Sequence, residues 1–438
     1  MSEERHEGNV RAFAAQALAR IVAGESLRTA FSAFAAKVRD PRDRALLSSL
    51  LHEGARWWLR YDAVTDRLLE HPVRERDPQL QALLVLGIVQ LEVLRIPEYA
   101  AVAATVDAAR ALRRPKFAGL INAVLRRWLR ERDAFIAQLD SNVVTRSAHP
   151  RWLVDLFEIN LPGQLDALLT ANNAQAPLWL RVNPRRARRE ELRARFAQAD
   201  HPTRVSEALA DALILEQSTD VTRLPGYGEG HFSVQDGAAQ YAAQLLDLRD
   251  GQRVLDACAA PGGKSAHILE SAAVDLIALD RDPQRLPRIV ENLDRLGLKA
   301  QVRAGDACEP DVWWDGRPFD RILIDAPCSA TGIIRRQPDI KLHRRASDLS
   351  ELVATQTRLL EAQWPLLARG GRLVYATCSV LADENSEQIA RFLARHTDAL
   401  LRDATPANWH HAAAGGAQNL PGEWDMDGFF YAVVDKAN

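Results

Sequence analysis

The strongest constraint on the fold lies after residue 251, where short apolar runs alternate with stretches of helical periodicity. The runs are RVLDAC (253–258), VDLIALD (274–280), AQVRAGD (300–306), FDRILIDAP (319–327) and RLVYATC (372–378). The stretches between them, such as PQRLPRIVENLDRLG, repeat apolar residues every three to four positions. Strands that alternate with helices predict an α/β fold with a mostly parallel, doubly wound sheet and helices on both faces.

The ends of these runs carry polar residues that packing does not explain. In a doubly wound sheet, ligands bind beyond the carboxyl ends of the strands. That rule places Cys258, Asp280, Asp306, Asp325 and Cys378 on one rim. Since buried acids are costly without partners, we expect this rim to hold a ligand.

The loop after the first run, DACAAPGGKSAHILE (256–270), indicates which ligand. Its small residues and paired glycines let the backbone approach a ligand closely before a helix begins. It lacks the first glycine of GxxxxGKS and is not GxGxxG, so a phosphate-cradling loop or a dinucleotide site has little support.

Two acids extend this site. Asp280 is placed to accept both hydroxyls of a ribose, and Asp306 could receive an adenine amino group. A ribose and an adenine without a phosphate site indicate S-adenosylmethionine as the cofactor. The alternative is a doubly wound domain whose strand-end acids are incidental.

The fourth run continues as IDAPCSATGIIRRQPDIK (324–341), with a thiol, Cys328, where methyltransferases of exocyclic amines carry an aromatic ring. Carbon 5 of a pyrimidine attacks a sulfonium methyl only after a thiolate has added to carbon 6. That chemistry needs an activated thiol, which Cys328 or Cys378 could supply, and hydrogen bonds to the ring, for which Asp325 is well placed. The alternative for either cysteine is simple packing.

The N-terminal part of the chain differs from this pattern. Residues 9–137 have helical periodicity throughout and predict five to seven helices. The apolar run ALLVLGIVQLEVL (82–94) is too short for a membrane span and contains Glu92, so we expect a buried core helix. The stretch 109–130 holds seven basic residues and no acid.

Residues 141–235 are interrupted by prolines, and a strand-like LWLRVN (178–183) precedes the basic run PRRARREELRAR. We therefore predict three domains: an all-helical domain at 1–140, a small mixed connecting domain at 141–235 and the α/β domain at 236–438. A charge run is most often a solvated helix face, so neither basic run by itself indicates a partner.

Composition excludes several classes of protein. The 438 residues carry a net charge of −2, so overall charge does not indicate nucleic acid. No two of the four cysteines are close together in the sequence, which argues against a zinc site. Four cysteines in a chain of this length indicate a reducing compartment. The first residues, MSEERHEGNV, lack the apolar core of a secretory signal. We expect a cytoplasmic protein with no metal and no membrane contact.

Several motifs together resemble the bacterial 16S ribosomal RNA cytosine carbon-5 methyltransferases of the Sun/Fmu (RsmB) type. They are FSVQDGAAQ (232–240), DACAAPGGKS, DAPCSATG with RRQPDIK, YATCS followed by ENSEQI, and DGFFYAVV (427–434). IPEYAAVAATVDAAR (96–110) and FAGLINAVLRR (117–127) are similar to the transcription antitermination factor NusB. The resemblance implies a NusB-like RNA-binding domain before a Rossmann-like class I methyltransferase domain.

The resemblance also implies roles for single residues. Cys378 would be the nucleophile and Cys328 would assist product release. Independently of the resemblance, we expect Cys258 and Cys308 to be small core or loop thiols. The implied cofactor contacts are Ala257, Cys258, Ala259, Ala260, Pro261, Gly262, Gly263, Asp280, Asp306 and Asp325.

The implied substrate is a cytosine in 16S ribosomal RNA, unassembled or partly folded, and we expect the enzyme to be a monomer. Basic residues at 110–130, 181–195 and 335–345 fit RNA, whose phosphates dominate affinity. The target base must leave any stack to reach a thiol. Two alternatives stay open: a DNA cytosine carbon-5 methyltransferase, which would use the Pro-Cys thiol as nucleophile, and a non-catalytic RNA-binding assembly factor.

Overall fold

The computed structural model describes residues 8–69, 73, 76–217 and 219–438, and these residues form two compact units. The helical unit comprises the chain up to Asn173 together with Ile334–Ala346. The sheet unit comprises Ala174–Ile333 and Ser347–Asn438. The boundaries expected at residues 140 and 235 do not coincide with the limits of these units, so the division into three domains stays a prediction.

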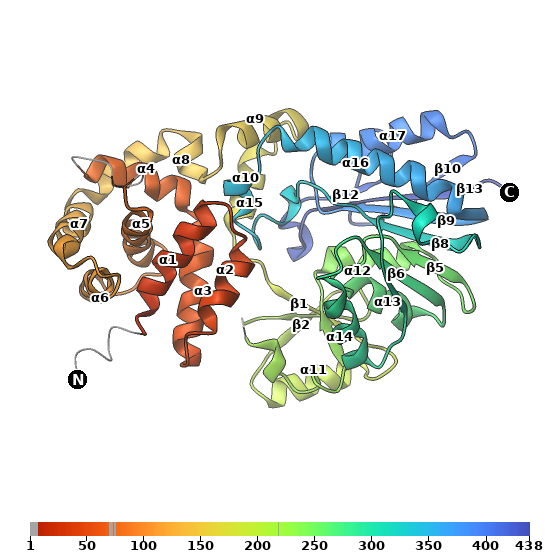
Figure 1. Cartoon of the computed structure of the whole chain (residues 1–438), viewed down its shortest axis with the longest axis horizontal. Helices are drawn as coiled ribbons and strands as arrows, with labels where there is room; N and C mark the ends of the chain where they lie inside the picture. Colours follow the sequence, from red (N-terminus) through yellow and green to blue (C-terminus); the bar gives the residue numbers. More distant parts are fainter. Residues whose placement is uncertain (1–7, 70–72, 74–75, 218) are drawn as a thin grey trace. The chain divides into compact units, whose positions relative to one another are not determined.

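The helical unit consists of helices joined by short turns (Figure 1). Asn9 caps the first helix by accepting hydrogen bonds from the N–H groups of Arg11 and Ala12. Asp40 and Asp77 each cap a helix that begins with proline, whose missing N–H costs nothing at that position. The helices are α1 (Val10–Val22), α2 (Leu27–Ala35), α3 (Pro41–Arg56), α4 (Trp58–Leu68), α5 (Pro78–Glu92), α6 (Glu98–Ala111), α7 (Ala118–Asp140), α8 (Val143–Ser147), α9 (Arg151–Asn160), α10 (Leu165–Asn173) and α15 (Ile340–His343).

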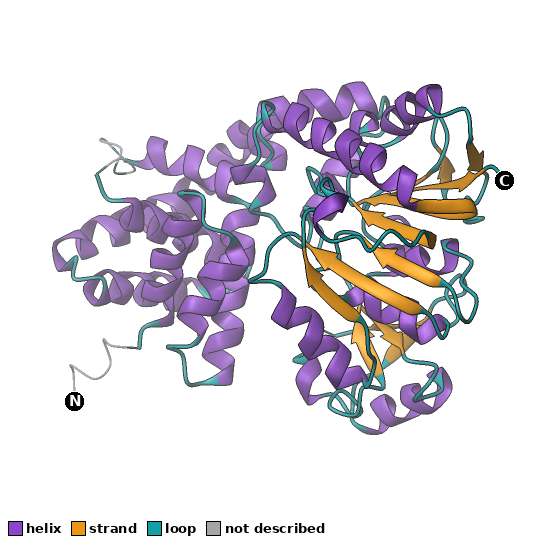
Figure 2. Cartoon of the chain, turned by 45° about the vertical axis from the view of Figure 1, so that its right-hand side comes forward, coloured by secondary structure: helices purple, strands orange, loops and turns teal. Residues whose placement is uncertain are grey.

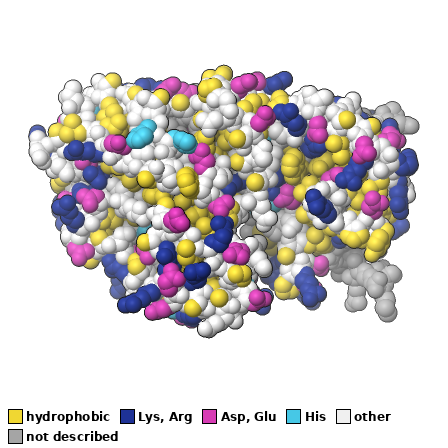
Figure 3. All heavy atoms as spheres, turned by 180° about the vertical axis from the view of Figure 1, so that it is seen from behind, with side chains coloured by type: hydrophobic (Ala, Val, Ile, Leu, Met, Phe, Trp, Pro, Cys, Tyr) yellow, Lys and Arg dark blue, Asp and Glu magenta, His cyan; other side chains and the backbone are white. Residues whose placement is uncertain are grey.

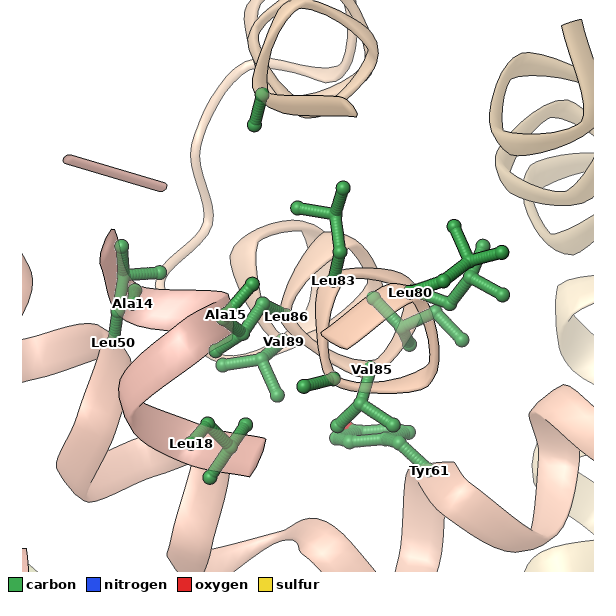
Figure 4. Packing of buried hydrophobic residues seen from close by; sticks show 14 of the residues in the cluster. Ala14, Ala15, Leu18, Leu50, Tyr61, Leu80, Leu83, Val85, Leu86 and Val89 are labelled. Carbon is green, nitrogen blue, oxygen red and sulfur yellow. The ribbon is translucent and has the colours of Figure 1, made fainter. Parts of the chain in front are cut away.

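Helix α5 is the centre of the core of this unit. It is buried on every side from Leu80 to Leu91 and packs against α1, α3, α4, α6 and α7. Figure 4 shows its side chains between Ala14, Ala15 and Leu18 of α1, Leu50 of α3 and Tyr61 of α4. A helix that is apolar all round must lie in a core or a membrane. The prediction of a buried core helix is confirmed, and no helix in the described part of the chain is long and apolar enough to cross a membrane.

The sheet unit is built on a nine-stranded sheet whose main path has the order β11-β12-β13-β9-β8-β5-β6-β7, with β10 paired to β13. Its strands are β5 (Arg253–Asp256), β6 (Asp275–Asp280), β7 (Gln301–Ala304), β8 (Phe319–Asp325), β9 (Leu367–Thr377), β10 (Ala399–Arg402), β11 (His410–His411), β12 (Ala417–Asn419) and β13 (Phe429–Lys436). Strands β5 to β9 pair in parallel and correspond to the five predicted runs, which confirms the predicted fold class. The antiparallel strands β10 to β13 were not predicted, because periodicity does not reveal pairing partners.

Alternating side chains of the parallel strands face two separate cores. Val254 belongs to one core and Leu255 to the other, and the same alternation holds for Val374 and Tyr375. Helices α12 (Gly237–Leu245), α13 (Gly263–Ser271) and α14 (Leu286–Leu296) cover the first face, whereas α16 (Asp348–Gln363) and α17 (Ser386–Arg395) cover the second (Figures 1 and 2).

A smaller antiparallel sheet, in the order β2-β3-β1-β4, packs against α11 (Arg189–Gln198). Its strands are β1 (Leu178–Val182), β2 (Thr203–Val205), β3 (Ala212–Leu215) and β4 (Phe232–Val234). Arg181 on β1 is buried; its guanidinium forms a salt bridge with Glu270 of α13 at 2.8 Å and donates to the carbonyl of Gly263 at 3.1 Å. The small sheet is therefore tied to both ends of the helix that follows the predicted cofactor loop.

Candidate active site

A cavity of about 220 Å³ opens at the carboxyl ends of the parallel strands of the sheet unit. It is lined by Ala257, Cys258, Ala260, Asp280, Arg281, Arg285, Asp306, Ala307, Cys308, Asp325, Pro327, Thr355, Arg358 and Leu359. The structure thus brings together six of the ten predicted cofactor residues. Cys308, expected to be only a structural thiol, also lies in the wall.

The other four predicted cofactor residues shape the loop without lining the cavity. The N–H of Ala259 donates to the carbonyl of Leu279 at 2.9 Å, which joins the loop to β6. Gly262 has a φ of +96°, and a Cβ there would come within 3.1 Å of Cα of Ile289. A side chain at Gly262 would therefore separate the loop from α14.

Asp280 fixes the same loop from the end of β6. One oxygen of its carboxylate accepts the N–H of Ala260 at 2.9 Å, and the other accepts the N–H of Asp282 at 3.1 Å. The residue is only 2% exposed. A carboxylate has about four acceptor sites, so two backbone bonds leave capacity for a ligand.

The chemistry of the cavity fits an adenosyl group. Asp306 lies beyond β7 and accepts the N–H of Cys308 at 2.8 Å, which orients its carboxylate. Pro327 and Leu359 are apolar residues of the wall against which a base could pack, and the carboxylate of Asp280 has acceptors to which ribose hydroxyls could donate. Among the described residues, no group of three or more His, Cys, Asp or Glu side chains could hold a metal ion.

The two predicted catalytic cysteines converge, because they follow the adjacent strands β8 and β9. Their sulfur atoms lie 3.4 Å apart. Cys328 is buried and Cys378 is partly exposed. The hydrogen bond to Cys378 and burial both raise the pKa of Cys328 well above its ordinary value, so Cys328 is held as a thiol.

Glu384, which the sequence analysis left without a role, joins the two cysteine loops. It is fully buried and accepts hydrogen bonds from the N–H and hydroxyl of Ser329 at 2.8 and 2.5 Å, and from the hydroxyl of Ser379 at 2.5 Å. Ser329 follows Cys328 and Ser379 follows Cys378, so one carboxylate sets the spacing of the thiols. Its place in ENSEQI, shortly after the second cysteine, was the available signal.

Lys264, in the first turn of α13, was also missed. Its ammonium group donates to the carboxylate of Asp325 at 2.7 Å. Burial alone would lower the pKa of Lys264, but Asp325 outweighs burial and the pKa is raised. The charge of Lys264 also interacts with Cys378, so a cation stands beside the predicted nucleophile.

Asp256, at the end of β5, is a further acid beneath the cavity. It is fully buried and, among the described residues, it accepts one hydrogen bond, from the hydroxyl of Ser265 at 2.6 Å. Burial raises the pKa of Asp256 to about 7, although the bond from Ser265 opposes that shift. This carboxyl therefore titrates near neutral pH, where the ionised form destabilises the fold.

The raised pKa of Asp256 predicts a pH-dependent stability. Its stabilising contribution is complete below the unfolded pKa of 3.8 and is lost as pH rises through about 7. Asp256→Asn should therefore gain stability relative to the parent as pH rises from 5 to 8, by roughly 2–4 kcal/mol. Thermal unfolding midpoints at several pH values would measure this gain. The exposed Asp294→Asn is the control, and an equal gain in both variants would contradict the assignment.

Comparisons with known proteins agree with this geometry. The chain matches the family models described as 16S rRNA methyltransferase RsmB/F over residues 243–435, NusB family over 8–130, and RsmF/B-like ferredoxin-like domain over 149–222. It is 46% identical to the ribosomal RNA small subunit methyltransferase B of Vibrio cholerae serotype O1, covering 98% of each chain.

A second relative, the ribosomal RNA small subunit methyltransferase B of Pseudomonas putida, is also 46% identical over 98% of each chain. The solved structure of the protein PH0851 has the same fold, with a TM-score of 0.82, 24% identity and coverage of 98% of this chain and 99% of that one. At 46% identity over nearly the whole length, common descent is the only reasonable explanation, and the chain belongs to the family of the ribosomal RNA small subunit methyltransferases B.

Proposed function

We propose that this chain transfers a methyl group from S-adenosylmethionine to carbon 5 of a cytosine in 16S ribosomal RNA, through a covalent bond between Cys378 and carbon 6. The observation that carries this proposal is the 3.4 Å separation of two thiols beside the strand-end cavity. Methylation of an amine or a hydroxyl needs no thiol, whereas methylation of carbon 5 needs a nucleophile at carbon 6.

The residues of the cavity would hold the cofactor by its adenosine. Asp280 would accept hydrogen bonds from the ribose hydroxyls and Asp306 from the adenine amino group, with the loop 257–263 closing one side. When bound, S-adenosylmethionine supplies an electrophilic methyl group on a positively charged sulfur.

Cys378 would attack as a thiolate, because the thiolate is the nucleophilic form of cysteine. Its sulfur forms a bond to carbon 6, and the π electrons of the carbon 5–carbon 6 bond make carbon 5 nucleophilic. Carbon 5 then gains the methyl group and S-adenosylhomocysteine remains. Asp325 would orient the cytosine by hydrogen bonding to its ring.

The adduct must then break down. The carbon-5 proton passes to a base, its bonding electrons restore the double bond, and Cys378 leaves as a thiolate. We assign Cys328 to the departure of Cys378 and not to the removal of the proton: its thiol adjoins the sulfur of Cys378 and would hydrogen-bond to the departing thiolate, while its raised pKa keeps it from competing as nucleophile. Attack and release thus fall to different thiols.

We expect RNA to bind to a small surface and not across a broad basic face, because basic and acidic side chains are intermixed on the face shown in Figure 3. An open groove of about 430 Å³ between α6 and α7 of the helical unit is the candidate surface. It contains Tyr99, 75% exposed, with Arg110 and Arg126. Arg110 is paired with Asp107, whereas Arg126 forms no ion pair with any residue that the structure describes.

An exposed aromatic ring beside arginines suits single-stranded RNA, since bases stack on rings and arginines meet phosphates. The substrate would be unassembled or partly folded 16S RNA, methylated in the cytoplasm by a monomeric enzyme.

Loss of the Asp280 carboxylate should weaken the cofactor site. Asp280→Ala should reduce affinity for S-adenosylmethionine by roughly 1.5–3 kcal/mol, the scale of hydrogen bonds to a charged group. Titration calorimetry measures this affinity. Asp282→Ala, the same substitution two residues later, is the control, and unchanged affinity in a folded Asp280→Ala variant would remove Asp280 from the site.

Replacement of each of the two cysteines by alanine should have a different effect on methylation and on the covalent RNA adduct. Cys378→Ala should abolish methylation and form no covalent RNA adduct. The Cys328→Ala variant should still form the bond between Cys378 and carbon 6 and should still methylate carbon 5. It should then accumulate a protein–RNA complex that resists denaturation, because a block in elimination traps the covalent adduct that addition has formed. A denaturing gel of each variant with labelled cofactor and either RNA or DNA tests both roles and the substrate.

Other outcomes of that experiment separate the alternatives. An adduct from Cys378→Ala but not from Cys328→Ala would reverse the roles and revive the DNA-type mechanism. Methylation that survives both substitutions would make the thiols packing residues. No methyl transfer by the unchanged protein to RNA or DNA would favour a non-catalytic assembly factor.

The α6–α7 groove should contribute to RNA binding in two separable ways. Arg126→Ala should reduce the salt slope of RNA binding by about 0.7, since roughly one phosphate contact is lost. Tyr99→Ala should weaken binding by roughly 1–3 kcal/mol with the slope unchanged, because stacking involves no counterion. Filter binding over a salt series measures both. The exposed Arg42→Ala in α3 is the control, and wild-type behaviour of both groove variants would exclude the groove.

A further inference from the structure

The segment Ile334–Ala346, which we call the docked segment, contains the motif RRQPDIK and has no role in the chemistry above. It follows the Cys328 loop directly, yet its contacts belong to the helical unit, and the chain returns to the sheet unit at Ser347. The chain therefore leaves the sheet unit within seven residues of Cys328.

The docked segment is held by hydrogen bonds from buried charged groups. The ammonium group of Lys341 donates to the carbonyl of Arg56 and to the side-chain oxygen of Asn173, both at 2.8 Å. The guanidinium of Arg56 donates back to the carbonyl of Arg335 at 2.7 Å. The carboxylate of Asp339 accepts the N–H of Leu27 at 3.0 Å.

These charges match the helix ends that they meet. Leu27 is the first residue of α2, whose N–H groups lack partners within the helix and carry partial positive charge. Arg56 is the last residue of α3, whose carbonyl carries partial negative charge. Asp339 thus meets the N-terminus of α2, and Lys341, two residues later, meets the C-terminus of α3.

Lys341 is only 2% exposed, and burying its charged side chain costs free energy. Burial and the nearby Arg56 lower the pKa of Lys341 well below its usual value, and Glu53 only partly opposes them. His149, which is also buried, interacts with the same charge. An apolar side chain would be cheaper to bury, so the lysine favours a specific position of the segment over stability.

The residues between Cys328 and the docked segment are fixed to the Cys378 loop. The N–H of Gly332 donates to the carbonyl of Cys378 at 2.9 Å, and the hydroxyl of Thr331 accepts the N–H of Val380 at 3.1 Å. A Cβ at Gly332 would lie 2.2 Å from the carbonyl oxygen of Gly428. There is no room for a side chain at Gly332, and a displacement at Arg335, three residues later, would act on these contacts between the Cys328 and Cys378 loops.

We infer that Lys341 and Asp339 are positioning residues: by fixing the docked segment, they hold the end of the Cys328 loop in the geometry needed to release the methylated RNA. This inference rests on the role proposed above for Cys328. It gives the docked segment a part in turnover that is separate from RNA capture.

The test compares Lys341→Met with Lys37→Met in the full chain, since Lys37 is an exposed lysine of the same unit and the substitution is identical. Lys341→Met should lower multiple-turnover methylation at least tenfold and accumulate the denaturation-resistant adduct, as Cys328→Ala does. Its affinity for S-adenosylmethionine should stay within twofold. Hydrogen exchange should accelerate in peptides covering 328–346 and not in those covering 253–280. Lys37→Met should resemble the parent in every measurement.

Other results would overturn the inference. Normal turnover without adduct would show that docking does not position the loop. A parallel fall in turnover, cofactor affinity and melting temperature, without adduct, would show a purely structural role. If Lys341→Met does not fold, Asp339→Asn, which keeps the side-chain shape, is judged by the same criteria. If Cys328→Ala itself traps no adduct, the proposed role of Cys328 fails; if it does and the docking variants do not, only this inference fails.

Discussion

Parallel pairing of β5 to β9 is the constraint on which the candidate site depends. Because parallel strands run in one direction, their carboxyl ends meet at one edge of the sheet. Asp256, Asp280, Asp325 and Cys378 are far apart in the sequence but lie at or just beyond those ends. The two cores on either face hold the strands in register, so hydrophobic packing fixes the positions of the polar groups that would do the chemistry.

Charged side chains then fix the geometry of the groups that the sheet brings close together. Glu384 joins the serines that follow the two cysteines, Lys264 pairs with Asp325 beside Cys378, and Arg181 pairs with Glu270 behind the cofactor loop. Glu384, Arg181 and Glu270 are buried, so the geometry of their contacts is costly to disturb. The docked segment repeats this principle in the helical unit, where Lys341 and Asp339 meet helix ends of the matching polarity.

The sequence was sufficient to predict the α/β class, the helical N-terminal part, the five parallel strands and the glycine-rich turn after the first of them. These features depend on local periodicity and on residue types such as glycine, which act over a few positions. It also placed both thiols at the ends of neighbouring strands. It did not predict β10 to β13 or the contribution of Ile334–Ala346 to the helical unit, because both depend on partners distant in the chain.

What the sequence by itself determined is the kind of chemistry available: thiols, carboxylates and a glycine-rich turn at strand ends. Only the tertiary structure decided how these groups relate to one another. The 3.4 Å between the sulfurs of Cys328 and Cys378, the raised pKa of Asp256 and the burial of Lys341 arise from packing between distant segments. Distances and desolvation are properties of the folded chain, and no local pattern encodes them.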